Sequence, residues 1–378
     1  MNQTYMSLNK TEWWSSLDAY WKRFFKIKLR PNLDSDRQAR DQYTPGEKEL
    51  DQLFKLDHLD VTNCSVSSLA PLESLPLTSL TLSSLSSLKS LTGLENLDLA
   101  YLALKHCGNI TDITLLESQK NLMRLELAGN GLGNLQSVGK LRELTSLVIA
   151  GEKVVDLKFI GELNKLEELV FSDLDVDLTP ISALTQLKKI FIRNTKLPTF
   201  EKIGPLPSLT HLHFLNGITE SLRGVEKFPS LIELVLHHCT TDDLNLVCEL
   251  SILKTLDITS TGIKDLTALN ASKSLAEIFI PEDNFSRDAI LEFQAKHPKC
   301  KIYSERGRSF PFMKHKRYTV TKELNDLKPG MNVQFSSYQY NHYDSVGIYY
   351  FKTDNNREVR VDAFWQEDLN WKEHLTEN

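Results

Sequence analysis

The sequence predicts an α/β fold: a right-handed solenoid of short repeats, with a curved parallel β-sheet on its concave face, an N-terminal helical cap and a small C-terminal antiparallel β unit. Three observations predict it. The pattern Leu-x-x-Leu-x-Leu recurs through the middle of the 378 residues. All five tryptophans lie outside that repetitive part, and strand-like alternation follows it. We expect a cap over 1–49, a solenoid of about 12 rungs over 50–303, and a basic connector with a β-rich domain over 304–378.

The segment before the repeats has the features of a cap. Residues 11–26 carry apolar side chains at helical spacing, namely Trp14, Leu17, Trp21, Phe24 and Phe25. The run Thr44-Pro45-Gly46-Glu47 is typical of a helix start, and predicts a second helix to about Phe54. A solenoid exposes apolar core at its ends and needs such a cover. We interpret the tryptophans as cap packing; the alternative is a platform for a ligand.

The repeats hold one register over most of the middle segment. The first Leu of the pattern falls at Leu56, Leu77, Leu94, Leu122, Leu144, Leu166, Leu187, Leu209, Leu231, Leu253 and Leu275. The spacings are 21, 17 and 28 before Leu122 and 21 or 22 after it, so the early units are expected to be distorted. Asn, Cys or Thr stands at the ninth position of several units, as in Asn130, where its side chain can satisfy backbone groups. Cys107 has no assigned position in this register.

This array resembles the leucine-rich repeat family, in the short 22-residue class of bacterial internalin-like proteins. The resemblance covers about 50–303 and rests on some seven consecutive units in one register. It implies one short parallel strand per unit on the concave side and a tight return on the convex side. The physics agrees, because one unit cannot bury its apolar face alone, whereas stacked units share a continuous core.

The C-terminal part alternates like strands of a small antiparallel unit. The segments are 318–321, 332–340, 346–352 and 358–365. Its aromatic residues could form a binding platform or the core of this unit: Tyr338, Tyr340, Tyr343, Tyr349, Tyr350 and Trp365. The connector before it carries five cations, which could contact phosphate or an acidic partner or form a solvated linker: Arg306, Arg308, Lys314, Lys316 and Arg317.

The concave face is the candidate binding site. The strand position between the second and third Leu forms a column that is acidic toward its ends and apolar in its centre: Asp60, Thr81, Asp98, Glu126, Val148, Val170, Phe191, His213, Val235, Asp257 and Phe279. Contiguous exposed apolar side chains with a polar rim mark interaction surfaces. The alternative is that Val and Phe stand there for strand propensity alone. The residues we expect to contact a partner are Val148, Val170, Lys189, Phe191, Arg193, His211, His213, Val235, His237 and Asp257.

No catalytic, cofactor-binding or metal-binding motif stands out, so we expect neither an enzyme nor a bound cofactor. His211, His213 and His237 could converge on a metal across adjacent strands, although their spacing matches no established zinc motif. The five cysteines fit structural positions of the repeats, apart from Cys107.

The charges suggest the kind of partner. Residues 1–49 hold nine basic and seven acidic side chains (+2), 50–303 hold 24 and 32 (−8), and 304–378 hold 11 and 11 (0), which sum to −6. An acidic array argues against nucleic acid and suits a basic protein or peptide. The sequence shows no apolar leader and no transmembrane stretch, so we expect a cytoplasmic monomer without membrane contact.

Three functions are compatible with these features. The first is a non-enzymatic protein-binding scaffold that uses the concave face. The second is its more specific version, a protein that neutralises a toxin or regulates an enzyme. The third places a ligand-binding or enzymatic activity in 304–378, with the array as a targeting module.

Overall fold

A computed structural model provides the structure of the chain. It describes residues 9–241, 244–281, 284–304, 317–324, 327–341, 346–354, 357–364 and 374–377. The chain divides into two compact units, Met1–Ile302 and Tyr303–Asn378, and we describe each by itself.

Four short helices precede the repeats: α1 (Lys10–Ser16), α2 (Ala19–Leu29), α3 (Arg37–Gln42) and α4 (Glu47–Leu53), with a 3₁₀ turn η1 (Pro31–Leu33) before α3. The single helix expected over 11–26 is wrong, because Leu17 is extended and the Asp18 carboxylate accepts a hydrogen bond from Trp21 N, which starts a new helix. The helix start expected near Thr44 is present with Gly46 as its N-cap, where Glu49 Oε2 accepts from Gly46 N at 2.9 Å.

The tryptophans of this segment pack as a cap. Trp13, Trp14 and Trp21 are at most 7% exposed. The indole N–H of Trp13 donates to the Pro71 carbonyl at 3.0 Å, and that of Trp21 donates to the Ser68 carbonyl at 2.8 Å. The helices therefore close the apolar end of the first repeat, and the rings are not a solvent-facing platform.

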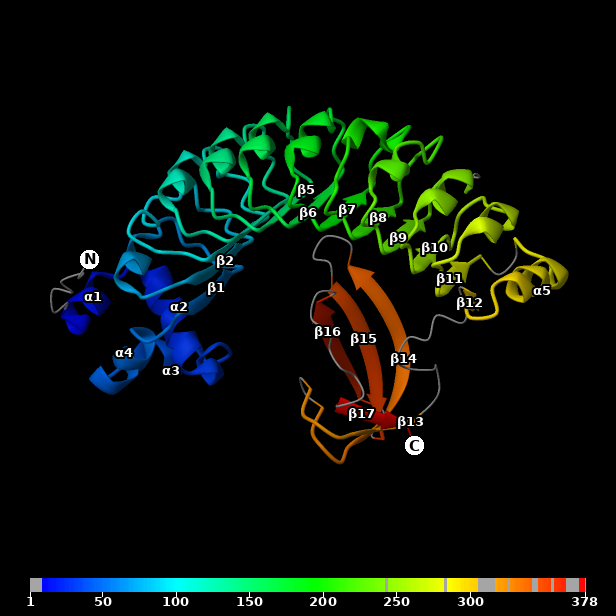
Figure 1. Cartoon of the computed structure of the whole chain (residues 1–378). Coiled ribbons are helices and arrows are strands. Elements are labelled where there is room, and N and C mark those ends of the chain that lie inside the picture. Colours follow the sequence, from blue (N-terminus) through cyan, green and yellow to red (C-terminus); the bar gives the residue numbers. More distant parts are fainter. Residues whose placement is uncertain are drawn as a thin grey trace. The chain divides into compact units, whose positions relative to one another are not determined.

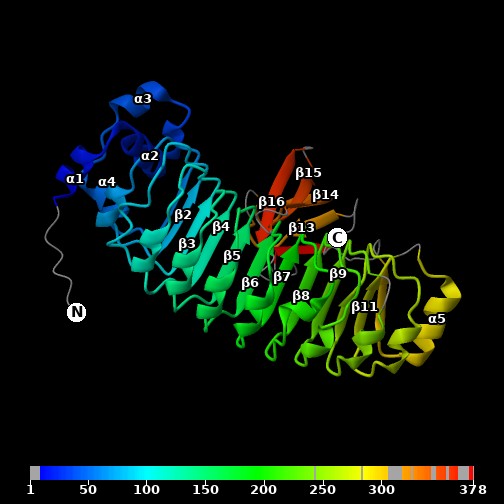
Figure 2. The same ribbon diagram turned by 90° about the horizontal axis from the view of Figure 1, so that it is seen from above.

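The repeats build one parallel sheet of 12 strands in sequence order. The strands are β1 (His58–Thr62), β2 (Ser79–Ser83), β3 (Tyr101–Lys105), β4 (Arg124–Ala128), β5 (Ser146–Ala150), β6 (Glu168–Ser172), β7 (Lys189–Arg193), β8 (His211–Leu215), β9 (Glu233–His237), β10 (Thr255–Asp257), β11 (Glu277–Ile280) and β12 (Lys301–Ser304). Figure 1 shows the sheet on the inner side of the curved first unit, and Figure 2 shows its strands side by side. The fold class predicted for this unit is confirmed.

Short 3₁₀ turns return the chain along the convex side: η2 (Ala70–Ser74), η3 (Thr114–Ser118), η4 (Gln136–Lys140), η5 (Lys158–Glu162), η6 (Thr179–Ala183), η7 (Phe200–Ile203), η8 (Val225–Lys227), η9 (Asn245–Glu249) and η10 (Thr267–Ala271). A full helix, α5 (Arg287–Lys296), replaces the turn in the last unit. Several turns begin with an Asp whose carboxylate accepts from the backbone N–H two residues later, as Asp177 does from Thr179 at 3.1 Å.

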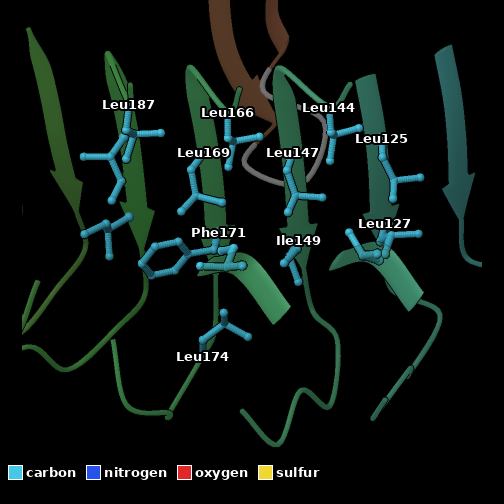
Figure 3. Close-up of a cluster of buried hydrophobic side chains, with 14 of the residues drawn as sticks. Leu125, Leu127, Leu144, Leu147, Ile149, Leu166, Leu169, Phe171, Leu174 and Leu187 are labelled. Carbon is cyan, nitrogen blue, oxygen red and sulfur yellow. The ribbon is translucent and has the colours of Figure 1, made fainter. Parts of the chain in front are cut away.

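The apolar side chains of the strands fill the space between sheet and turns. Leu125 and Leu127 of β4, Leu147 and Ile149 of β5, and Leu169 and Phe171 of β6 lie in this interior (Figure 3), and each of them is at most 1% exposed. Full burial of such a side chain stabilises a fold by about 1.5–3 kcal/mol before the entropy cost of ordering it. The core is continuous from Trp13 to Cys300, so neighbouring repeats stabilise one another.

The third strand corrects the predicted register. The sequence indicated a unit that begins at Leu94, which would place Asp98 in the concave column. The structure starts this unit at Leu99: β3 pairs Ala103 with Thr81 and with Glu126. The spacings then become 22 and 23, so the early units are regular, and Cys107 takes the ninth position. There, Cys107 N donates to Asn130 Oδ1 at 2.8 Å, as expected for this inward turn.

A residue with a left-handed backbone follows each of the strands β1 to β10. Asn63, Ser84, His106, Asp173, Asn194, Asn216, His238 and Ser260 have φ between 48° and 60°, and Gly129 and Gly151 fill the same position. At most of these positions the N–H donates to the last carbonyl of the next strand, as His106 N does to Ala128 O at 2.8 Å. The repeated turn thus extends the ladder and bends the chain toward the convex side.

The second unit contains an antiparallel sheet in the order β16-β15-β14-β13-β17. The strands are β13 (Arg317–Val320), β14 (Asn332–Asn341), β15 (Val346–Thr353), β16 (Glu358–Phe364) and β17 (Leu375–Glu377). Tyr318, Val333, Phe335, Phe351 and Val361 form part of its own buried core. The predicted small antiparallel β unit is confirmed.

Candidate functional site

The strand pairing assembles the predicted concave column. Val148 of β5 pairs with Val170 of β6, and the row continues in register through Phe191, His213, Val235 and Asp257 on β7 to β10. Adjacent parallel strands lie about 4.8 Å apart, so these six side chains lie next to one another across the sheet. The column is a geometric fact of the fold, whereas its role in binding stays a prediction.

The centre of this column is less exposed than the sequence suggested. Val170 is 7% exposed, Phe191 and Val235 are 8% exposed, and Val148 alone of the four apolar members is half-buried. Three of its four apolar residues are therefore buried in the structure, and the expected contact of this surface with a partner stays a prediction. Mutual shielding contributes to this burial, since the rings of Phe191 and His213 meet edge to face with centroids 4.5 Å apart.

A buried imidazole and a carboxylate lie at the middle of the face. His213 is 1% exposed, and its Nε2 lies 2.6 Å from Oε1 of Glu233 on β9. The hydrogen bond from His213 lowers the pKa of Glu233 below its ordinary value. Glu233 is therefore held as a carboxylate in one orientation, with 29% of its side chain exposed.

The flanking positions hold most of the charged groups. Lys189 of β7 is exposed, and His211 of β8 is half-buried beside it. Burial lowers the pKa of His211, so its ring is neutral at neutral pH. Its Nδ1 lies 2.8 Å from the Thr210 hydroxyl. Farther along the face, Lys105 and Glu126 form an ion pair at 2.9 Å.

Two predicted contact residues are more buried than their charge suggests. Arg193 is 4% exposed and Asp257 is 5% exposed. The Asp257 carboxylate accepts hydrogen bonds from Thr259 N at 2.9 Å and from the Thr259 hydroxyl at 2.5 Å. Asp257 therefore stabilises the exit of its own strand, which sequence spacing did not indicate.

The histidines do not assemble a metal site. His213 Nε2 points to Glu233, and the ring of His237 instead meets that of His238 with centroids 4.2 Å apart. Among the residues that the structure describes, no group of three or more His, Cys, Asp or Glu side chains could hold a metal ion.

The cysteine thiols are structural. Burial raises the pKa of Cys64 and Cys107, and raises that of Cys239 to about 12 and that of Cys300 to about 11. Cys239 Sγ donates to the Phe214 carbonyl at 3.1 Å. These thiols stay protonated at neutral pH, which is the opposite of an activated nucleophile.

Glu233 is the residue that the predicted contact set left out. Its signal was present, because it occupies the first strand position of β9, in register with His211, a residue of that set. What the sequence could not show is the bond from His213, since it joins different columns of adjacent strands.

Two further predictions lie outside the described parts of the chain. The basic side chains at 306–316 belong to an undescribed segment. Among the C-terminal aromatics, only Tyr350 has a described side chain, and it is half-buried. The platform and core alternatives therefore both stay predictions.

The 12-stranded parallel sheet and the continuous core of repeated leucines define the first unit as a leucine-rich repeat solenoid. It is similar to an internalin from Listeria monocytogenes, with a TM-score of 0.56 and 20% identity over 76% of this chain and 88% of that chain. It is also similar to a leucine-rich repeat protein from Leptospira interrogans, with a TM-score of 0.50 and 22% identity over 68% of this chain and 74% of that chain. No protein-family model matches the sequence, and no curated protein is significantly similar to it.

The stacked repeats of such a solenoid create an extended concave surface. No helix in the described residues is both long enough and apolar enough to cross a bilayer.

Proposed function

We propose that the chain is a non-enzymatic scaffold that binds a protein or peptide on the concave face of the solenoid. The observation that carries this proposal is the in-register row Val148–Val170–Phe191–His213–Val235, flanked on one side by the polar and charged column Glu168, Lys189, His211 and Glu233. An apolar and aromatic centre with a polar rim is the arrangement of a protein-binding surface. Val148, Lys189, His211 and Glu233 are its accessible members.

The partner we propose is basic. The array carries 24 basic and 32 acidic side chains, so its net field attracts cations. Cytoplasmic location and a monomeric state complete the proposal. All five cysteines are unpaired, which supports a reducing compartment. The high thiol pKa values support a role without nucleophilic catalysis.

A pair of matched double variants tests the face. Val148→Lys with Glu168→Lys places two cations on β5 and β6 of the concave side. Val155→Lys with Glu249→Lys makes the same two substitutions away from the sheet, where both residues are exposed. Because like charges across an interface cost several kcal/mol, the concave variant should bind its partner at least ~10-fold more weakly, and the control should bind as the wild type does.

The measurement is affinity capture from the proteome of the source organism, followed by titration of the captured protein. Thermal melts confirm that both variants fold. A partner that binds the concave variant and the control equally well would contradict the proposed face.

A further inference from the structure

We infer that Glu233 is the specificity-determining residue of the concave face and that its carboxylate takes an arginine side chain of the bound partner. The inference rests on the proposed function and adds the chemical group that the site selects. Three features of the structure carry it: how Glu233 is held, what its second oxygen lacks, and which charges surround it.

Glu233 is oriented by a neighbour that cannot move freely. His213 approaches Glu233 Oε1 to 2.6 Å from the adjacent strand. The His213 ring is itself 1% exposed and packs edge to face against Phe191. A carboxylate fixed in this way loses little side-chain entropy when it binds, which is the advantage of preorganisation.

The other oxygen of Glu233 is an open acceptor. No residue that the structure describes donates a hydrogen bond to Oε2, and 29% of the side chain remains exposed. Two carboxylate oxygens can accept about four hydrogen bonds, so the pair with His213 uses only part of this capacity. The free capacity lies beside the buried row, where a bound partner would exclude water.

The surroundings favour a cation at this place. The hydrogen bond from His213 holds the pKa of Glu233 low, so the group is ionised at neutral pH. The in-register neighbours of Glu233 are His211 on β8 and Thr255 on β10. Burial keeps His211 neutral, and the cation Lys189 lies one strand farther, on β7. Thr255 carries no charge, so neither immediate neighbour in this column is a cation, although the charge of Lys189 also lowers the pKa of Glu233.

Arginine fits better than lysine because the site is dry. Val235 and His213 beside Glu233 are less than a tenth exposed, and a partner would cover the remainder. A guanidinium is more weakly hydrated than an ammonium and forms directed hydrogen bonds to carboxylates, so it loses less on burial.

The experiment selects 12-residue peptides from a random display library on the full-length chain. Peptides that the Val148→Lys/Glu168→Lys variant still binds are discarded, which leaves peptides of the concave face. Each remaining arginine is then replaced by citrulline, which keeps the shape and removes the charge. Kd values are measured for the wild type, for Glu233→Gln and for the matched control Glu277→Gln, which alters the same strand position on β11.

We expect a shared arginine whose citrulline replacement weakens binding about 10- to 100-fold on the wild type and on Glu277→Gln, but less than about 3-fold on Glu233→Gln. Peptides of the concave face without a shared arginine, or an equal citrulline effect on Glu233→Gln, would overturn the inference and leave the proposed function standing. If no peptide depends on the concave face, the proposed function fails and the inference fails with it.

A second variant keeps the test valid if Glu233→Gln is destabilised. If Glu233→Gln melts well below the wild type, Glu233→Asp replaces it, because the shorter side chain keeps the charge and withdraws the oxygens from the partner. A citrulline effect as large on Glu233→Asp as on the wild type would also overturn the inference.

Discussion

The hydrogen bond between His213 and Glu233 makes the concave face sensitive to pH. Folding lowers the pKa of Glu233 below its unfolded value of about 4.3. The hydrogen bond therefore stabilises the folded state fully above about pH 4.3. This stabilisation is lost as the pH falls through the folded-state pKa, where the carboxylate becomes protonated. Glu233→Gln removes this contribution. The charge of Glu233 also raises the pKa of His211, so His211 titrates at a lower pH in Glu233→Gln than in the wild type.

We therefore expect the wild type to be more stable than Glu233→Gln by about 1 kcal/mol at pH 7, and this difference to shrink as the pH falls below the unfolded pKa of about 4.3. Urea unfolding across this pH range measures it. A difference that persists undiminished well below about pH 4.3 would contradict the assigned bond.

The side chain of Asn130, at the ninth position of its repeat, forms hydrogen bonds to three buried groups. Asn130 Oδ1 accepts from Cys107 N at 2.8 Å, and its Nδ2 donates to Leu104 O at 2.9 Å and to Glu152 Oε1 at 2.8 Å. All three partners are buried. Removal of the Asn130 side chain leaves these three buried groups without that hydrogen bond.

Asn130→Ala should lower the free energy of unfolding by about 2–4 kcal/mol, because buried groups without partners are costly. The exposed Asn134 also accepts a backbone hydrogen bond, from Gln136 N at 3.0 Å, so Asn134→Ala is the control and should cost less than about 1 kcal/mol. Denaturant unfolding compares the two. Equal losses would show that the buried position carries no special weight.

At the scale of elements, repetition was predictable and one strand was not. Ten of the eleven predicted unit starts agree with the structure, because a single unit can match the pattern by chance but consecutive units in one register do not. The segment 94–104 contains two overlapping matches, Leu94-x-x-Leu97-x-Leu99 and Leu99-x-x-Leu102-x-Leu104. Only the second match lies at nearly equal distances from the units before and after it, 22 and 23 residues. A unit that starts at Leu99 also places Cys107 at the ninth position.

The register of β3 predicts opposite outcomes at two positions. Ala103 is fully buried and Asp98 is exposed. Ala103→Leu should therefore destabilise the fold by about 1–3 kcal/mol through overpacking, while Asp98→Leu should change it by less than about 1 kcal/mol. Thermal unfolding checks both. A greater loss at Asp98 would restore the register that starts at Leu94.

The concave site was predictable in its positions and not in its environment. Side-chain alternation placed Val170, Phe191 and His213 in one column. Their burial depends on side chains of other strands, and the local bond between Asp257 and Thr259 depends on the backbone turn that follows β10. Neither is encoded in a spacing.

For the whole solenoid, stability passes from repeat to repeat, and the cap secures one end. Trp21 is fully buried and bonds to the first convex segment through Ser68 O. Trp21→Ala should lower the free energy of unfolding by about 3–5 kcal/mol.

Hydrogen exchange should locate this loss. We expect faster exchange in β1 and β2 than in β9 and β10, because fraying begins at the uncovered end. Tyr20→Ala, at a position that is 52% exposed, is the control and should leave the pattern unchanged. Uniform loss of protection along the array would contradict a cap that acts locally.

The central claim is that the sheet side of the solenoid, and not its convex side, contacts the partner. Site-specific photo-crosslinking tests it most directly, with p-benzoylphenylalanine in place of Lys189 on β7 or of Lys158 on η5, both of which are exposed. The account predicts a covalent adduct with the captured partner from position 189 and none from position 158. An adduct from position 158 alone would contradict it.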